Sequence, residues 1–178
     1  MEKKDLLKDV IKHIDIKSYN STELVDAMRN MSFTSRDTAR AADILMMMCK
    51  EKECTNILTL AGSTSAAGCM QVYVDMVRNK MIDVVVATGA SIIDMDLFEA
   101  LGFKHYIGEK ENVIPDTTLR DLYIDRIYDT YIDEEELQAC DHTTFEIANM
   151  LEARPYSSRE FIYEIGKWLH EGHAVKKD

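Results

Sequence analysis

Two short apolar runs, each followed by small residues, constrain this fold more than any other feature of the sequence. The first run is Asn56–Ala61 and the second is Met81–Ala87. Both runs have the length of a strand and lack polar alternation, which is typical of strands buried on both faces of a parallel sheet. The sequence therefore predicts two buried strands.

The segment between the two runs predicts how they are connected. Cys69–Lys80 carries apolar residues at helical spacing, so the pattern is strand, helix, strand. Parallel strands joined by a right-handed crossover have their carboxyl ends at one edge of the sheet. The small-residue turns Gly62–Gly68 and Thr88–Ser91 are therefore expected at that edge, where open α/β sheets bind ligands.

Helical spacing and capping residues predict further elements on both sides of this unit. The predicted helices are Lys3–His13, a segment capped by Ser21 or Thr22, Ser35–Met48, Asp94–Leu101, Asp133–Leu151 and a last segment capped by Ser157 or Ser158. The other predictions are a short strand at Lys104–Ile107, a helix turn at Asp116–Leu122 and an irregular or extended link at Arg126–Ile132. The expected fold is α/β in one domain, with a helical segment over 1–53 and an α/β part over 54–178.

Length and charge exclude several classes of protein. The 178 residues suit one globular domain, and 46% of them are hydrophobic, so a core can form. The 21 basic and 32 acidic residues give a net charge of −11, which argues against a nucleic-acid partner. No apolar run is long enough to span a membrane, and the start of the chain does not look like a signal peptide. We expect a cytoplasmic protein without a membrane partner.

The cysteines and histidines give no metal signature. The cysteines are Cys49, Cys54, Cys69 and Cys140. They lack zinc-ribbon spacing, and most of them adjoin apolar runs, so buried and reduced thiols are predicted. His170 and His173 have no third or fourth ligand nearby and are expected in a solvated tail. His105 is expected to be a surface or packing residue.

The turns and the acids after them are the candidates for a binding site. Helix-opening amides among small residues can hold a phosphate, although Gly62 and Gly68 match a dinucleotide fingerprint only loosely because Thr64 replaces the middle glycine. A plain tight turn is the alternative. Asp94 and Asp96 follow the second turn, where they can meet a ribose hydroxyl or an amine; the alternative is a role as helix cap and first-turn acids.

Longer segments carry a more specific pattern. The central ones are Thr59–Gly68 and Met81–Ile92. The flanking ones are His13–Ile16, Glu23–Met28, Ala39–Ile44, Phe98–Gly102, Asp125–Thr130 and Arg154–Phe161. In this order they resemble the amino-terminal half of the deoxyhypusine synthase family, particularly its archaeal and bacterial members. The resemblance extends over nearly the whole chain.

The resemblance implies a fold and an activity. The family has a Rossmann-like parallel sheet flanked by helices, binds NAD and assembles as a homotetramer with active sites between subunits. NAD oxidises spermidine, a lysine captures the aminobutyl group as an imine, and the group passes to a lysine of the translation factor that thereby acquires hypusine. Relatives pass the group to a free polyamine and make homospermidine.

The resemblance also assigns residues. The first NAD-binding turn would comprise Gly62, Ser63, Thr64, Ser65 and Ala66, and the second Thr88, Gly89, Ala90 and Ser91. Asp94 and Asp96 would bind substrate, and a carboxylate such as Asp94 suits the ammonium groups of spermidine. No metal ligand is implied.

Three departures from the family pattern limit what this chain can do. Ser63 and Ser91 stand where many members have asparagine in or beside a turn, and Met95 stands where a glutamate is expected. The catalytic lysine of the family belongs to a carboxyl-terminal half that these residues do not include, so no catalytic residue is predicted here. We therefore expect a partner, either a carboxyl-terminal half or a full-length homologue, and self-association of the incomplete sheet.

Two alternatives stay open. The chain is either part of a working synthase or an inactive regulatory or structural subunit of a full-length relative. A homospermidine synthase-type enzyme is the further alternative, and only the acceptor of the aminobutyl group distinguishes it.

Overall fold

The structure is a computed structural model that describes residues 1–109 and 113–173. The chain divides into two compact units. One unit comprises residues 1–12, 61–68 and the described residues from 87 onwards, and the other comprises 13–60 and 69–86. Both predicted turns belong to the first of these units, so their mutual geometry is defined within one compact body.

The unit of residues 13–60 and 69–86 contains the predicted strand pair. Its elements are η1 (Ile16–Ser18), α2 (Thr22–Met28), α3 (Phe33–Lys50), β1 (Ile57–Leu60), α4 (Met70–Arg78) and β2 (Val84–Ala87, whose last residue lies in the other unit). β1 and β2 form a two-stranded parallel sheet, as the spacing predicts. Asn56 anchors the start of both strands, because its N–H donates to Asp83 Oδ2 at 2.8 Å and its Nδ2 donates to the Met81 carbonyl at 3.0 Å.

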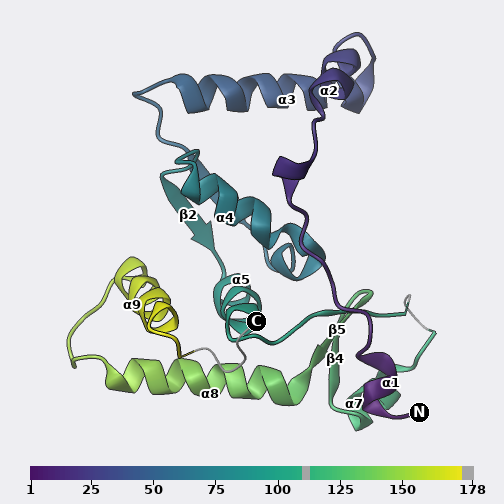
Figure 1. The fold of residues 1–178 in the computed structure, drawn as a ribbon, viewed down its shortest axis with the longest axis vertical. Coiled ribbons are helices and arrows are strands. Elements are labelled where there is room, and N and C mark those ends of the chain that lie inside the picture. Colours follow the sequence, from purple (N-terminus) through teal and green to yellow (C-terminus); the bar gives the residue numbers. More distant parts are fainter. Residues whose placement is uncertain (110–112, 174–178) are drawn as a thin grey trace. The chain divides into compact units, whose positions relative to one another are not determined.

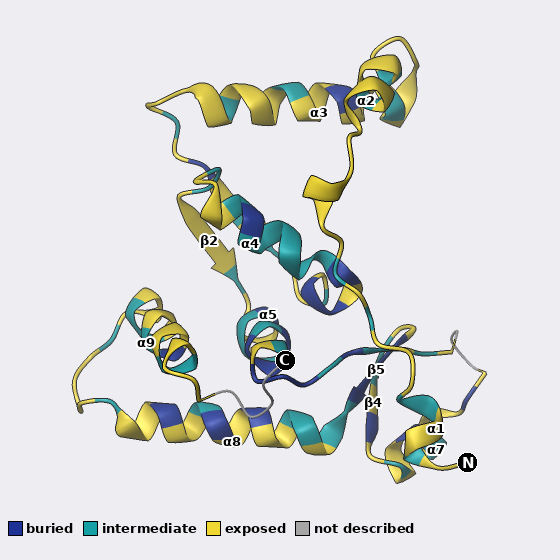
Figure 2. Cartoon of the chain, viewed as in Figure 1, coloured by how far each residue is buried: buried dark blue, intermediate teal, exposed yellow. Residues whose placement is uncertain are grey.

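The predicted burial of these strands is wrong. Val84, Val85 and Val86 are 43%, 41% and 54% exposed, and Ile57 is 57% exposed. Figure 2 shows β2 in the colour of exposed residues. A strand is buried on both faces only when further strands and covering layers flank it, and within the described residues this sheet has two strands.

The other unit holds the main core. Its elements are α1 (Lys3–Leu6), η2 (Ser65–Cys69, whose last residue lies in the other unit), α5 (Gly89–Ser91), η3 (Ile92–Leu97), α6 (Phe98–Ala100), β3 (Tyr106–Ile107), α7 (Asp116–Asp121), β4 (Ile124–Ile127), β5 (Thr130–Asp133), α8 (Glu134–Met150) and α9 (Ser158–His170). The three strands form an antiparallel sheet in the order β3-β5-β4. α5, η3 and α6 follow one another directly, so residues 89–100 form one helical stretch.

Two apolar clusters stabilise this unit. The larger cluster joins the helical stretch 89–100 to α8 and α9, and its members include Phe98, Leu101, Ile147 and Ile165. The smaller cluster joins α7 to the sheet through Leu119, Ile124 and Tyr131. Figure 1 shows α8 running from the β4–β5 hairpin toward α9, and Figure 2 shows buried residues along it.

Helices with strong capping signals lie where the sequence predicts them. The carboxylate of Asp133 accepts from the amides of Glu135 and Glu136 at the start of α8. Ser157 and Glu160 form a reciprocal capping box at the start of α9. These capping contacts join residues within three positions of each other, which explains why the starts of both helices could be predicted from the sequence.

Three predicted elements differ from the structure in extent or in detail. The first helix ends at Leu6 instead of His13, because residues beyond it pair with β3: Ile107 N–H donates to the Asp9 carbonyl at 2.7 Å, and Val10 forms a bridge with Tyr106. The stretch Arg126–Ile132, predicted as an irregular or extended link, is extended and contains most of the β4–β5 hairpin. The helix expected from Asp94 begins at Gly89 instead, because Thr88 caps it.

The cysteines are free thiols, and their predicted burial is correct for Cys140 and wrong for the exposed Cys49. Cys54 and Cys69 are half-buried. Within the described residues, no helix has the length and apolar character needed to cross a membrane.

Candidate functional site

The two predicted turns lie against each other. Ser91, at 1% exposure, donates its hydroxyl to the carbonyl of Ala61 at 3.4 Å. A Cβ built on Gly62 would lie 3.7 Å from Thr88 Oγ1 and 3.9 Å from the Cβ of Ala90. Gly62 therefore faces the second turn without a side chain between them. The structure thus brings together the two turns that the sequence predicts at one edge of the sheet.

The first turn is held in an unusual conformation. Ser63 has φ of 82°, a left-handed value that non-glycine residues seldom adopt. Its N–H donates to the Sδ of buried Met95 at 3.2 Å, and its carbonyl accepts from Ala67 N–H at 3.0 Å. Strain of this kind often accompanies a functional site. Ser65 is 1% exposed, and its hydroxyl has no hydrogen-bond partner among the described residues.

Gly68, at the end of the first turn, has a structural role. Its φ is +94°, and a Cβ there would approach the Lys12 carbonyl to 3.0 Å. A side chain at this position is excluded by the backbone on both counts. Gly68, which loosely matches the last glycine of a dinucleotide fingerprint, is thus required by the backbone conformation of the turn.

The second turn is the beginning of a helix. The side chain of Thr88 accepts from the Ser91 N–H at 3.3 Å, and the Ile92 N–H donates to the Thr88 carbonyl at 3.2 Å. Gly89 and Ala90 therefore contribute first-turn amides, which an α-helix leaves without an internal acceptor. Both residues are exposed. A helix start of this kind suits a phosphate group.

Asp94 and Asp96 lie farther along the same helical stretch, and neither is its cap, because Thr88 is. The thiol of Cys140 donates to the Ile93 carbonyl at 3.3 Å and so links α8 to η3. Partial burial raises the pKa of Asp94, and the charge of Asp141 on α8 raises it further. The charge of Asp141 thus acts on Asp94, and a cation near the two carboxylates would relieve their repulsion.

The histidines have structural surroundings. His105 is 1% exposed, its Nδ1 lies 2.6 Å from Glu99 Oε1, and its ring centroid lies 5.0 Å from that of Phe98. It is a packing residue, which is one of the two roles predicted for it from the sequence. His173 stacks on Trp168 with centroids 5.0 Å apart. The described part of the chain contains no group of three or more His, Cys, Asp or Glu side chains placed to hold a metal ion.

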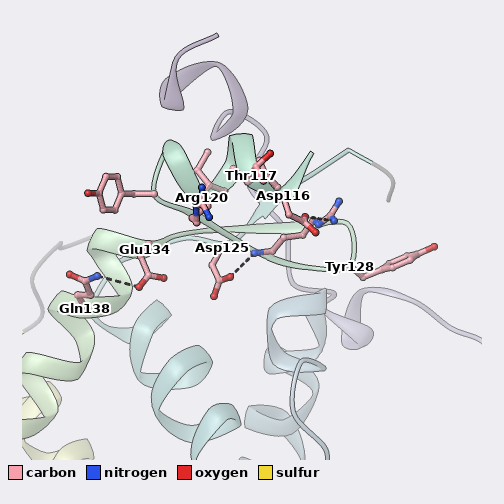
Figure 3. A pocket seen from close by; sticks show the side chains of 11 residues that line it. Asp116, Thr117, Arg120, Asp125, Tyr128, Glu134 and Gln138 are labelled. Carbon is pink, nitrogen blue, oxygen red and sulfur yellow. Dashed lines mark hydrogen bonds and ion pairs between the residues drawn. The ribbon is translucent and has the colours of Figure 1, made fainter. Parts of the chain in front are cut away.

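A pocket of about 770 Å³ lies elsewhere in the same unit and was not expected from the sequence. Figure 3 shows its lining side chains, which come from α7, β4, the β4–β5 turn and the start of α8. None of the residues assigned to NAD or substrate lines it. The pocket was not predicted because the β4–β5 hairpin forms its wall, whereas the sequence predicted an irregular or extended link over Arg126–Ile132 and no hairpin.

Comparisons with known proteins place the chain in a family. The sequence model of the family described as deoxyhypusine synthase matches residues 23–177. A deoxyhypusine synthase-like protein of Caulobacter vibrioides is 65% identical over 176 residues, which are 99% of this chain and 47% of the relative. A deoxyhypusine synthase-like protein of Coxiella burnetii is 58% identical over 176 residues, covering 99% of this chain and 49% of the relative.

A probable deoxyhypusine synthase of Methanosarcina acetivorans is 37% identical over 163 residues, or 92% of this chain and 46% of the relative. The chain spans about half the length of the curated relatives it matches. These comparisons confirm the resemblance carried by the turn segments and their flanks. The chain belongs to the deoxyhypusine synthase family.

Proposed function

We propose that this chain provides the NAD-binding part of a deoxyhypusine synthase-like enzyme. The reaction would be NAD-dependent transfer of the aminobutyl group of spermidine to a lysine of a translation factor. The observation that carries the proposal is the contact between the two small-residue turns, seen in the Ser91–Ala61 hydrogen bond. Membership of the family supports the same reaction, and with it a Rossmann-like sheet in the complete assembly.

The residues at the two turns fit NAD. Gly62 presents bare backbone toward Thr88 and Ala90, which allows a dinucleotide to approach closely. The first-turn amides of Gly89 and Ala90 would hold the pyrophosphate. The buried hydroxyl of Ser65, which has no partner among the described residues, is a further group for the ligand. When bound, NAD would supply the acceptor for the hydride removed from the polyamine.

The carboxylates beyond the second turn fit the other substrate. Asp94 has a raised pKa from burial and from the charge of Asp141, so an ammonium group nearby would favour its ionised form. Asp94 would orient one amine of spermidine, and Asp96, on the same helical stretch, would contribute a second carboxylate. Hydride transfer needs such positioning, because the reacting carbon must be held near the nicotinamide.

The catalytic lysine would come from outside these 178 residues. The relatives are about twice as long, so their remaining half is the natural source. We propose that the chain works with a carboxyl-terminal half or a full-length homologue and assembles as an oligomer. The alternatives are an inactive regulatory subunit of a full-length relative and a homospermidine synthase-type enzyme.

Binding of NAD can be tested with a substitution that the fold tolerates. Gly62→Ala would place a methyl at ordinary contact distance from Thr88 and Ala90, so the fold should persist while the methyl fills the approach to the turns. We expect calorimetric titration to show NAD binding that weakens about tenfold or more in this variant, the cost of one misplaced group in a tight site. Gly166→Ala, in α9 with nothing within 4 Å, is the matched control.

Two results would contradict the proposal. The first is an absence of NAD binding at about 1 mM, the weak end of specific affinities. The second is equal affinity in the Gly62→Ala variant and the unsubstituted chain. Turnover is tested separately. The chain alone should not reduce NAD with spermidine, whereas a mixture with the remaining half of the Caulobacter vibrioides relative should reduce it. Restored reduction without modification of the translation factor would favour the homospermidine alternative.

A further inference from the structure

The pocket of about 770 Å³ has a sheet edge as one wall. β4 is the last strand in the order β3-β5-β4, so within the described residues one of its edges has no partner strand. Backbone groups of alternate β4 residues point toward β5, and those of the other residues point away. The Arg126 N–H belongs to the second set, because it donates to the Oδ1 of Asp125 at 3.1 Å instead of to β5. By alternation, the backbone of Ile124 also faces outward.

Two strained tyrosines flank this strand. Tyr123 precedes β4 with φ of 54°, and Tyr128 follows it with φ of 56°. Both line the pocket, and the two residues are 59% and 67% exposed. Glycine would adopt these backbone conformations without strain, so a large aromatic residue at each position points to a role for the side chain.

The charges of the pocket are not balanced. Arg126 forms an ion pair with Asp116, and Arg120 forms one with Asp121 at 3.1 Å. Two further carboxylates of the lining, Asp125 on β4 and Glu134 at the start of α8, therefore give the pocket a negative charge. Figure 3 shows both projecting from their elements beside the strand. Lys3 does not neutralise Asp125 or Glu134, since its Nζ pairs with Asp133 and Glu135 instead.

One donor in the pocket also lacks an acceptor. The side chain of Arg126 is 13% exposed, and its Nη1 is buried without a hydrogen-bond partner among the described residues. A buried donor left in this state favours a ligand that offers an oxygen. The two carboxylates disfavour an anion, so a neutral carbonyl is the suitable acceptor.

We propose that the β4 pocket binds an extended peptide segment that carries a lysine or arginine side chain, by addition of a strand to β4. The peptide backbone would pair with the outward groups of Ile124 and Arg126, and the Arg126 N–H would exchange its bond to Asp125 Oδ1 for one to a peptide carbonyl. A second peptide carbonyl would accept from Arg126 Nη1. The basic side chain would lie near Asp125 and Glu134, with Tyr123 and Tyr128 at the two ends of the strand. Strand addition is an established mode of peptide recognition. The proposal does not depend on the proposed function.

The test uses the full chain and a fluorescent, acetylated hexapeptide of alternating valine and lysine. Two comparison peptides replace the lysines with glutamates or a central valine with proline, which cannot donate to a strand. We expect the lysine peptide to bind at least about tenfold more tightly than either comparison peptide, because charge and backbone pairing both contribute. Backbone amide shifts on binding should centre on Ile124 and Arg126.

Substitutions locate the site. Asp125→Asn keeps an oxygen that can accept from the Arg126 N–H and removes the charge, so the fold should be retained while affinity for the lysine peptide falls about tenfold. Asp37→Asn removes an equal charge at an exposed residue of α3, outside the pocket lining, and should leave affinity nearly unchanged. Equal binding of all three peptides, an unchanged affinity in Asp125→Asn, or amide shifts centred on β1 and β2 would overturn the proposal.

A second copy of the chain is the competing occupant. Sedimentation of the chain alone tests it, because a dimer that Asp125→Asn dissociates would replace the peptide proposal with self-association through β4. A sedimentation coefficient that is the same for both chains, together with selective binding of the lysine peptide, is the result that we expect.

Discussion

The amide of Ser63 donates to the Sδ of Met95 at 3.2 Å. This contact connects the first turn to the helical stretch 89–100, which begins in the second turn. Met95 is 4% exposed, so its thioether is part of the core as well as an acceptor. Met95 thus has a definite role here. It supports Ser63 in its left-handed conformation.

Substitution of Met95 separates packing from hydrogen bonding. Met95→Leu conserves volume and should cost less than about 1.5 kcal/mol in the free energy of unfolding, whereas Met95→Ala should cost about 2–5 kcal/mol. Because leucine offers no acceptor, the Ser63 amide should exchange with deuterium faster in the Met95→Leu variant while amides of α8 keep their rates. Unchanged exchange at Ser63 would show that the sulfur contact does not hold the turn.

Contacts between neighbours in sequence could be predicted, and contacts between distant residues could not. The caps at Asp133 and Ser157 depend on residues within three positions, so the starts of α8 and α9 could be predicted. The β4–β5 hairpin turns at Tyr128, which adopts φ of 56° without the glycine or asparagine that marks such turns. Because this hairpin forms one wall of the pocket, the pocket was not predicted either.

The candidate site divides in the same way. Small residues after two apolar runs predicted that the turns meet, and the Ser91–Ala61 bond agrees with that geometry. The proximity of Asp94 to Asp141 could not be predicted, since it depends on how α8 packs against η3. Exposure of the valines in β2 was also unpredictable, because an apolar run does not reveal whether its covering layers belong to the same stretch of sequence.

Gly108 is constrained by the ring of a distant tyrosine. A Cβ at Gly108 would lie 2.7 Å from Tyr131 Cε1, and Tyr131 is 1% exposed, so neither group can move freely. Gly108→Ala should lower the free energy of unfolding by about 1–3 kcal/mol through overpacking. Gly166→Ala, in an open helical position, should raise it by about 0.5–1 kcal/mol. Urea denaturation of the two variants would reveal opposite signs; two stabilised variants would contradict the close approach.

Asp94 should make stability depend on pH in an identifiable direction. Burial and the charge of Asp141 raise its pKa in the folded chain above the ordinary value of 3.8. As pH rises from 3.8 through the raised pKa, the unfolded chain releases its proton first, so Asp94 lowers stability progressively over this window. Asp94→Asn should therefore be more stable than the unsubstituted chain at neutral pH, and the difference should vanish below pH 3.8. Thermal unfolding across this range measures it, with Asp121→Asn as the exposed control.

Cys140 should resist thiol reagents while Cys49 reacts. The Cys140 side chain is fully buried, and burial together with the charges of Asp141 and Asp94 raises the pKa of its thiol to about 12. At about pH 8, roughly one Cys140 in ten thousand is then a thiolate, which is the reactive form. Cys49 is exposed and should be modified first. Mass spectrometry after brief alkylation should find Cys140 unmodified in the folded chain and modified in urea. Modification of Cys140 at the rate of Cys49 under native conditions would show that α8 does not stay packed against η3.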